Sequence, residues 1–276
     1  MKTWLITGVS SGFGRALAVE VLARGDRVYG SVRRADDARA LEALAPGRAR
    51  AVEFDVTDAA AIGRAVAAIE ARDAIDVLVN NAGYGLVAGV EEASLAEIRA
   101  QFDVNVFGAV AVMQAVLPQL RARRRGHIVN ITSVSGLVGW PSLGIYSGSK
   151  FALEGISETL AQEVAGLGIK VTMVEPGGFR TEFAGRSRAA AQREIADYAD
   201  TVGACRRILS GHAGHERGDP RKAAEAIIAI VDAQAPPLRL LLGADAIEYA
   251  DGKLRAQLDE IARWQPLSVS TDFAPA

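Results

Sequence analysis

Residues 3–14, TWLITGVSSGFG, join a short apolar run to a turn that holds glycines at positions 8, 12 and 14. A glycine-rich turn between a buried strand and a helix allows close approach of the backbone to a pyrophosphate, and the helix N-terminus offers it free N–H groups. The stretch therefore predicts a fold that opens with a strand, a phosphate-binding turn and a helix.

The rest of the chain repeats this alternation of short aliphatic runs with longer, alanine-rich segments at helical spacing. Such alternation predicts an α/β fold of the Rossmann type, a doubly wound single domain over residues 1–276 with helices on both faces of a seven-stranded, mostly parallel sheet. The seven expected strands cover residues 3–7, 27–32, 51–54, 77–80, 127–132, 170–175 and 238–242.

One region, residues 177–218, breaks this rhythm with polar residues and several glycines, and only residues 189–199 show a weak helical pattern. Long excursions inside compact domains usually serve function, so we expect a substrate lid here. The pattern resumes with a helix at Asp219-Pro220, and the chain is expected to end in a polar tail.

Composition excludes several classes of function. The chain has 31 basic and 33 acidic residues, a formal net charge of -2, which disfavours a nucleic-acid partner. A single cysteine fits a reducing compartment. No apolar run approaches the roughly 18 residues of a membrane span, so we expect a cytoplasmic protein without a membrane partner.

The opening turn also contains Gly-x-Ser-x-Gly around Ser10, the nucleophile elbow of α/β-hydrolases. In those enzymes the elbow normally follows several strands, whereas Ser10 follows only the first. The candidate bases are poor, because His127 opens a buried strand and His212 and His215 lie among glycines. A serine hydrolase is the weaker alternative. The His212-x-x-His215-Glu216 pattern does not match zinc-hydrolase orders, and no metal is expected.

Tyr146-Ser147-Gly148-Ser149-Lys150, taken with the turn at residues 7–14 and Asn80-Asn81-Ala82-Gly83, closely resembles the classical short-chain dehydrogenase/reductase family. The resemblance covers nearly the whole chain, and its last segments resemble the hydroxysteroid-dehydrogenase-like branch. It implies an NAD(P)-dependent oxidoreductase that interconverts a ketone and a secondary alcohol by hydride transfer. The catalytic residues that it implies are Asn105, Ser133, Tyr146 and Lys150.

The chemistry of these side chains agrees with that assignment. Tyr146 and Lys150 are four residues apart and share one face of a helix, so an ammonium stands beside a phenol. Together with a positively charged nicotinamide, Lys150 would favour the phenolate and make Tyr146 a general acid/base. Ser133 would donate a hydrogen bond to the developing alkoxide. By resemblance, Asn105 holds a water that links Lys150 to solvent, and Lys150 also contacts the cofactor ribose.

The resemblance also assigns the cofactor contacts. They comprise the glycine turn, the ends of the third and fourth strands and the segment beside the nicotinamide: Thr7, Gly8, Ser10, Ser11, Gly12, Phe13, Gly14, Asp55, Val56, Asn81, Ala82, Gly83, Pro176, Gly177, Phe179 and Thr181, with Tyr146 and Lys150.

NADP(H) is predicted over NAD(H). The second strand ends in Val32, where an NAD-preferring relative usually has an acid that binds the ribose diol. Ser31, Arg33 and Arg34 could instead bind a 2′-phosphate, which suits the forked guanidinium group. Because Asp36 and Asp37 follow closely, the two arginines could also simply begin a solvated helix.

The substrate is expected to be a lipophilic ketone or secondary alcohol. Its site should lie between Ser133 and Tyr146 and under the lid, and these regions carry large apolar side chains. The candidate substrate contacts are Ser133, Trp140, Leu143, Tyr146, Phe179 and Phe183. Simple core packing is the alternative for each apolar member.

A second class of function stays open: a non-catalytic dinucleotide-binding protein that senses redox state or acts as a scaffold. The intact set of Ser133, Tyr146 and Lys150 favours the enzyme, because a sensor does not need groups that transfer protons. By resemblance, the protein forms a homo-oligomer, a dimer or tetramer, through the helices at residues 95–116 and 151–166.

Overall fold

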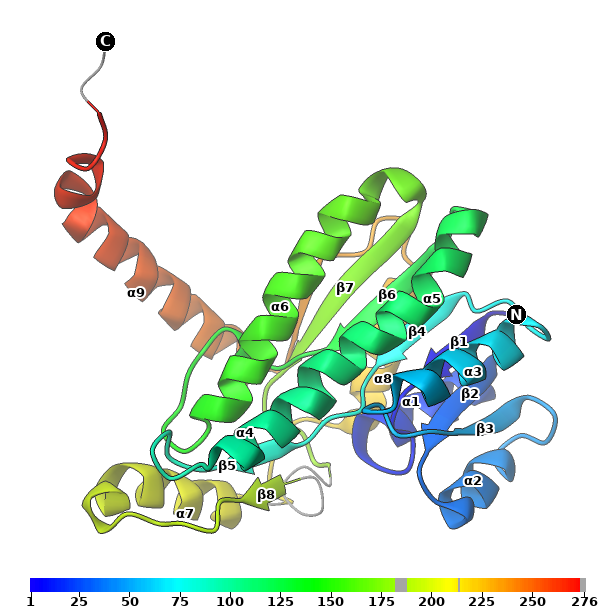
Figure 1. Ribbon diagram of the computed structural model, residues 1–276, viewed down its shortest axis with the longest axis horizontal. Helices are drawn as coiled ribbons and strands as arrows, with labels where there is room; N and C mark the ends of the chain where they lie inside the picture. Colours follow the sequence, from blue (N-terminus) through cyan, green and yellow to red (C-terminus); the bar gives the residue numbers. More distant parts are fainter. Residues whose placement is uncertain (182–187, 213, 274–276) are drawn as a thin grey trace.

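The computed structural model describes residues 1–181, 188–212 and 214–273, and its main sheet has seven strands in the order β3-β2-β1-β4-β6-β7-β9 (Figure 1). All neighbouring pairs run parallel. The strands are β1 (Thr3–Ile6), β2 (Arg27–Val32), β3 (Ala49–Glu53), β4 (Val77–Asn80), β6 (Gly126–Ile131), β7 (Ile169–Pro176) and β9 (Arg239–Leu242). The predicted fold class is confirmed, and each expected strand matches one of these to within two residues.

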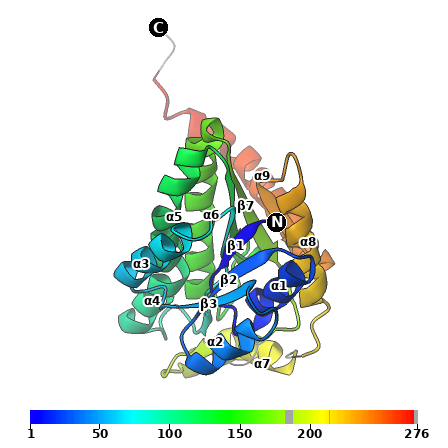
Figure 2. The same cartoon turned by 90° about the vertical axis from the view of Figure 1, so that its right-hand side faces the viewer.

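Helices cover both faces of this sheet (Figure 2). One face carries α1 (Gly12–Ala23) and α8 (Pro220–Asp232), and the other carries α3 (Ala59–Glu70), α5 (Ala109–Arg123) and α6 (Gly144–Val164). The short α2 (Ala35–Glu42) follows β2.

The strands are apolar on both sides because each face of the sheet has its own core. Along β1, Trp4 and Ile6 join the core beneath α1 and α8, whereas Leu5 joins the core beneath α3, α5 and α6. All three side chains are fully buried. Successive side chains of a strand point to opposite faces, so a doubly covered strand shows no polar alternation.

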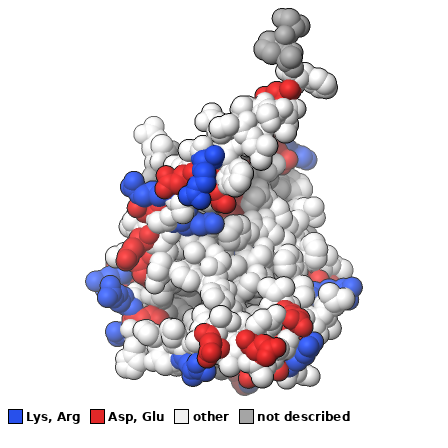
Figure 3. Space-filling model, turned by 90° about the vertical axis from the view of Figure 1, so that its left-hand side faces the viewer, with Lys and Arg blue, Asp and Glu red and all other residues white. Residues whose placement is uncertain are grey.

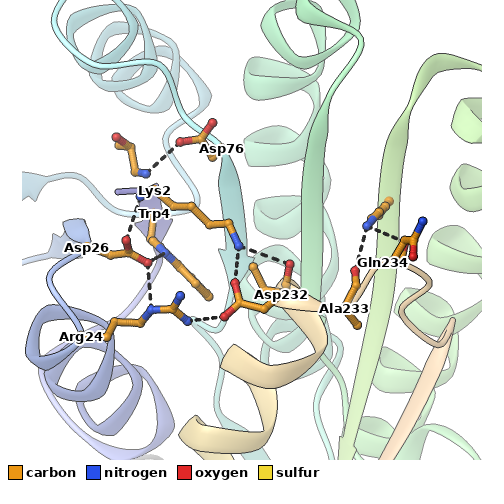
Figure 4. A network of polar contacts seen from close by, with 11 residues as sticks. Lys2, Trp4, Arg24, Asp26, Asp76, Asp232, Ala233 and Gln234 are labelled. Carbon is orange, nitrogen blue, oxygen red and sulfur yellow. Dashed lines mark hydrogen bonds and ion pairs between the residues drawn. The ribbon is translucent and has the colours of Figure 1, made fainter.

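A polar network lies at the end of the sheet where β1 begins (Figure 4). Asp232, at the end of α8, forms ion pairs with Lys2 and with Arg24 at the end of α1. Asp26 accepts hydrogen bonds from the Lys2 backbone N–H (2.8 Å) and the Trp4 indole N–H (3.2 Å). These contacts hold the two helices together at the end of the sheet opposite the glycine turn.

A continuous helical segment leads across the other face. It consists of α4 (Leu95–Phe102), a π-helical turn η1 (Asp103–Gly108) and α5. By length and composition alone, residues 95–123 could span a membrane, but 44% of their most apolar window is buried inside the protein. Val112, Val116 and Leu120 are fully buried against the sheet, as in the core helix of a soluble protein.

The segment expected to be a lid, residues 177–218 and called the lid below, begins and ends at one place, where Phe179 and Gly218 form a parallel bridge. Within it, β8 (Arg188–Ala190) pairs with β5 (Gly85–Val87), and α7 (Ala204–Gly211) follows two short helical turns. The expectation of a helix at residues 189–199 is therefore wrong in position. Pairing with β5, a partner about 100 residues away in the chain, outweighs the weak local periodicity.

The expected polar tail is corrected over residues 244–269, which form α9 (Ala244–Val269), a helix of 26 residues. Its first turns pack on the body through Ala246 and Ala250, which are fully buried. Beyond them the helix projects away from the sheet (Figure 1). This segment contains many charged residues, but its apolar residues recur at helical spacing.

Candidate active site

The glycine turn between β1 and α1 has a shape that only glycine permits. Gly8 and Gly12 have φ of 71° and 57°, in the left-handed region. A Cβ on Gly14 would lie 2.3 Å from the Gly8 carbonyl oxygen and 2.4 Å from Nδ2 of Asn81. Ser11, the N-cap of α1, makes no side-chain capping hydrogen bond, so the first N–H groups of this helix are available to an anion.

Side chains from neighbouring strands hold this turn in place. The Thr7 hydroxyl accepts hydrogen bonds from the N–H groups of Asn81 and Ala82, both at 2.9 Å. The Asn81 amide donates to the carbonyl oxygens of Thr7 and Gly8, also at 2.9 Å. Thr7 and Asn81 therefore join the turn to the end of β4.

The structure corrects the role expected of Ser31. Its hydroxyl accepts the N–H of Gly8 at 2.9 Å, and the residue is only 3% exposed. This side chain supports the glycine turn from within and does not face a 2′-phosphate.

Arg33 and Arg34, by contrast, extend into solvent just beyond β2, with side chains 78% and 73% exposed. Arg33 lies 3.7 Å from the carboxylate of Asp55, which follows β3, the neighbouring strand. Val56 packs against Gly108, where a Cβ would lie 2.9 Å from its side chain. The predicted contacts of the adenosine half thus meet at the carboxyl ends of β2 and β3.

Ser133, Tyr146 and Lys150 come together as predicted. Ser133 is two residues beyond β6, and its side chain forms a hydrogen bond with that of Tyr146 on α6. Nζ of Lys150, one turn further along α6, lies 5.8 Å from the centroid of the Tyr146 ring and donates to the Ile131 carbonyl at 2.9 Å.

Burial governs the titration of both groups on α6. It raises the pKa of Tyr146 to about 12, against the opposing effect of the Ser133 hydrogen bond. It lowers the pKa of Lys150 to about 8, against the attraction of Glu154. Burial therefore disfavours the phenolate in the protein alone, and the expected lowering of this pKa is left to Lys150 together with the bound nicotinamide.

Asn105 lies in the π-helical turn η1, a kind of irregularity that is frequent at functional sites. Its amide nitrogen donates to the Tyr84 carbonyl (2.9 Å) and the Ser149 hydroxyl (3.1 Å), and its Oδ1 accepts the Tyr84 N–H at 3.1 Å. A Cβ on Gly83 would lie 3.1 Å from Oδ1 of Asn105 and 3.8 Å from Nζ of Lys150. Asn105 and Lys150 therefore flank the same glycine.

A buried acidic pair lies beside Lys150. Glu154, one turn further along α6, and Glu175 on β7 have side chains only 5% and 1% exposed, and Arg239 forms ion pairs with both. Burial raises the pKa of Glu154 to about 7 and also raises that of Glu175. The neighbouring carboxyl of Glu175 raises the pKa of Glu154 further, which favours retention of a proton by the pair near neutral pH.

The expected substrate contacts Trp140, Leu143 and Tyr146 form one apolar cluster with Val87 and with Leu209 of the lid. A cavity of about 240 Å³ lies beside this cluster. Its lining comes from residues 88–91, from residues 140–144 and from Tyr198, Thr201 and Val202 of the lid.

Phe179 belongs to the cofactor side of the site and not to this cluster. Its ring lies 5.1 Å from that of Phe13 in the glycine turn, and a Cβ on Gly218 would touch it at 2.4 Å. Its expected substrate contact is therefore corrected. Thr181 lies near Gly12. Phe183 falls outside the described residues.

The segment expected beside the nicotinamide is hydrogen-bonded to the end of β9 and to the start of α9. The N–H of Gly177 donates to the Leu242 carbonyl (2.9 Å), and that of Gly178 to the carboxylate of Asp245 (2.7 Å). Pro176 is the last residue of β7. The sequence gives no sign of Asp245, because this role depends on where α9 begins.

Two further contacts were not predicted. The side chain of Glu92 is buried among lid residues, where it pairs with Arg206 and accepts the N–H of Ile195 at 2.9 Å. Tyr249 of α9 packs edge-on against Trp140, with ring centroids 4.6 Å apart. In the sequence nothing distinguishes Glu92 from its exposed neighbour Glu91.

Comparison with known proteins agrees with this geometry. Residues 2–192 match the family described as short chain dehydrogenase. The chain is 40% identical over 245 residues to a 3-ketodihydrosphingosine reductase of Bacteroides thetaiotaomicron, covering 87% of each protein. It is 37% identical over 196 residues to an NADPH-dependent 3-dehydrocapnine reductase of Ornithobacterium rhinotracheale, covering 68% of this chain and 69% of that protein.

The fold has a solved counterpart in a short-chain dehydrogenase from Streptomyces avermitilis, with a TM-score of 0.92, 44% identity and 98% of each chain covered. The glycine turn, the residues on α6 and these likenesses lead to one conclusion. The chain belongs to the short-chain dehydrogenase family and is an NAD(P)-dependent oxidoreductase that acts on alcohol and carbonyl groups.

Proposed function

We propose that this protein reduces a lipophilic ketone to a secondary alcohol with NADPH, and that Tyr146 is the proton donor. The observation that carries the proposal is the position of Tyr146, which hydrogen-bonds to Ser133 and belongs to the apolar cluster of Trp140 and Leu143. The oxygen of a carbonyl group bound there would lie near the hydroxyl groups of Tyr146 and Ser133, in apolar surroundings.

Each side chain has a distinct part in this reaction. Tyr146 gives its proton to the carbonyl oxygen, while the Ser133 hydroxyl donates a hydrogen bond to the same oxygen. Lys150 stabilises the phenolate that remains. Asn105 binds the water through which Lys150 exchanges protons with solvent. When bound, the nicotinamide would supply the hydride, and its positive charge would offset the burial that disfavours the phenolate in the protein alone.

The residues of the glycine turn fit the pyrophosphate of this cofactor. Gly8, Gly12 and Gly14 leave space for close approach, and Ser10, Ser11 and Phe13 stand where α1 begins. The preference for NADPH rests on Arg33 and Arg34, which are exposed beyond β2, and on Val32, which carries no charge to repel a 2′-phosphate. The relative from Ornithobacterium rhinotracheale is named NADPH-dependent.

The lipophilic character of the substrate rests on the cavity beside Trp140, whose walls are mostly apolar. Two relatives carry names that describe reduction of a 3-keto or 3-dehydro compound, one of them a sphingoid lipid. We place the chain in the hydroxysteroid-dehydrogenase-like branch, which names a group of sequences and does not imply a steroid.

We also propose a cytoplasmic homo-oligomer, a dimer or tetramer, built through η1, α5 and α6. Phe107 of η1 and Phe151 and Ile156 of α6 are large apolar side chains that are 62%, 45% and 37% exposed. Contact with a second copy would cover them.

The proposal is tested by titrating the purified protein with NADPH and NADH, followed by fluorescence and thermal shift, and by adding long-chain ketones to the tighter complex. We expect NADPH to bind more tightly than NADH. We also expect added ketone to cause oxidation of NADPH, followed by its absorbance at 340 nm. Binding without turnover of any ketone would favour a redox sensor or scaffold. If neither nucleotide binds, the interpretation of the glycine turn is wrong.

A further inference from the structure

The end of α9 forms an arm, residues 251–269, that leaves the body of the protein (Figure 1). From Leu254 onward every described residue is exposed, and Lys253 is half-buried. Seven large apolar side chains of α9 are between 51% and 66% exposed: Ile247, Leu254, Leu258, Ile261, Trp264, Leu267 and Val269. A soluble monomer rarely leaves so many apolar side chains together in solvent.

Five of these side chains lie along one side of the helix. Ile247, Leu254 and Ile261 recur every seven residues, and Leu258 and Trp264 lie beside them, which defines the arm stripe. The stripe continues the line of Ala246 and Ala250, the residues that pack on the body. The buried side of α9 thus extends beyond the protein that it packs against.

We propose that the arm stripe packs antiparallel against the arm stripe of a second copy of this chain. Two such arms related by a two-fold axis would place Leu254 of each copy opposite Gln257 of the other. This contact is independent of the proposed reaction.

Charge complementarity supports the antiparallel arrangement. Lys253 and Glu260 are seven residues apart and border the same edge of the stripe. In antiparallel helices the residues of one such edge face each other, so each Lys253 would meet a Glu260 of the other copy. The dimer would therefore contain two symmetric ion pairs.

The area of the contact is that of a weak specific interface, below the size of a stable one. Five apolar side chains bury on the order of 300–600 Å² in each copy, and the stems of Lys253, Gln257 and Glu260 add to it. A stable interface buries about 800 Å² per partner.

A membrane surface fits the arm less well. Residues 251–263 contain three acidic side chains, Asp251, Asp259 and Glu260, and three basic ones, Lys253, Arg255 and Arg263. Helices that lie on membranes are usually rich in Lys and Arg on the polar face. Figure 3 views the side from which the end of the chain projects; charged side chains lie near the margins of this face, and the surface between them is uncharged.

The first test compares the mass of full-length protein with that of Ile261→Glu by light scattering after size exclusion. Because Ile261 is 66% exposed, the variant should fold, and its mass should be half that of the wild type, because the arms are proposed to join a pair of copies that α5 and α6 do not join. The matched control, Ala256→Glu, adds the same charge on the opposite side of the arm and should keep the wild-type mass. An unchanged mass for Ile261→Glu would overturn the proposal.

The second test exchanges the charges. Lys253→Glu and Glu260→Lys should each raise the dissociation constant of this contact roughly fivefold or more, and the double variant should restore it. A double variant as weak as the singles would contradict the antiparallel register. Sedimentation of the wild type with phosphatidylserine vesicles, abolished by Ile261→Glu, would overturn the proposal in favour of a membrane surface.

Discussion

The carboxylate of Glu92 and the guanidinium of Arg206 form an ion pair in which the acidic side chain is 1% exposed and the basic one 16%. Glu92 precedes α4, and Arg206 belongs to α7 of the lid. The same carboxylate accepts the N–H groups of Gly89 (2.8 Å) and Ile195 (2.9 Å). One buried acid therefore fastens the lid to the loop that lines the cavity.

Replacing Glu92 with Gln should loosen the lid. Loss of the buried carboxylate leaves Arg206 with only the exposed carboxylate of Glu194, 3.2 Å away, at a cost of up to about 3–5 kcal/mol. Because this cost falls on the closed lid, KM for a ketone should rise roughly 10- to 100-fold, with NADPH binding changed less than about twofold. Steady-state kinetics and nucleotide titration measure the two effects.

Glu194→Gln is the matched control for that variant, because Glu194 also pairs with Arg206 but its side chain is 74% exposed. We expect its KM to stay within about twofold of the wild type. Equal effects of the two substitutions would show that Glu92 does not hold the lid.

Tyr146→Phe should keep cofactor affinity and remove turnover. The substitution preserves the shape of the ring within its apolar cluster and deletes the transferable proton. We expect kcat to fall by about 10²–10⁴-fold, the usual range for a general acid, at an unchanged dissociation constant for NADPH. Stopped-flow kinetics with a saturating ketone make the measurement, and full activity in the variant would refute the assigned role.

Arg33→Ala should weaken NADPH binding about tenfold and leave NADH binding nearly unchanged, because only NADPH carries the 2′-phosphate. Arg39→Ala is a suitable control, since its side chain is 73% exposed on α2 and pairs with Asp36. Isothermal titration with both nucleotides distinguishes the two variants. If Arg33→Ala binds NADPH like the wild type, the 2′-phosphate is held elsewhere.

Glu154→Gln should change how stability depends on pH. The folded protein raises the pKa of Glu154 from 4.5 to about 7, so the folded state binds this proton more tightly than the unfolded chain. The stability that this provides is complete below about pH 4.5 and is lost as the pH rises through about 7. Glutamine stays neutral, so the variant should gain up to about 3 kcal/mol relative to the wild type between pH 5 and pH 8.

Chemical denaturation at several pH values tests this effect. Glu158→Gln serves as the control, because Glu158 also pairs with Arg239 but is 50% exposed. Only Glu154→Gln should show a gain over the wild type that grows with pH across this range. Absence of such a gain would show that Glu154 does not change its protonation state between pH 5 and pH 8.

The sequence was sufficient to predict features that depend on local spacing. The strands follow from apolar runs that are buried on both faces, and Tyr146 and Lys150 share a helix face because they are four residues apart. The start of α3 was also predicted correctly, since Asp58 accepts the Ala61 N–H at 2.9 Å.

Features that depend on distant partners could not be predicted. Ser31 faces Gly8 because β2 lies beside β1, and Phe179 meets Phe13 because the chain after β7 passes the glycine turn. The burial of Glu92 depends on a lid more than 100 residues away in the chain. For such residues the tertiary fold decides which of two similar side chains becomes buried.

Phe179 and Gly218 meet where the lid leaves the sheet and where the chain returns to it. Because these ends are adjacent, the segment between them is an insertion whose length can change with little strain on β7 or α8. Such an insertion can be replaced as a unit during evolution. Lineages that inherit the same glycine turn and the same α6 could therefore diverge in substrate range by recombination or by gradual drift of this segment alone.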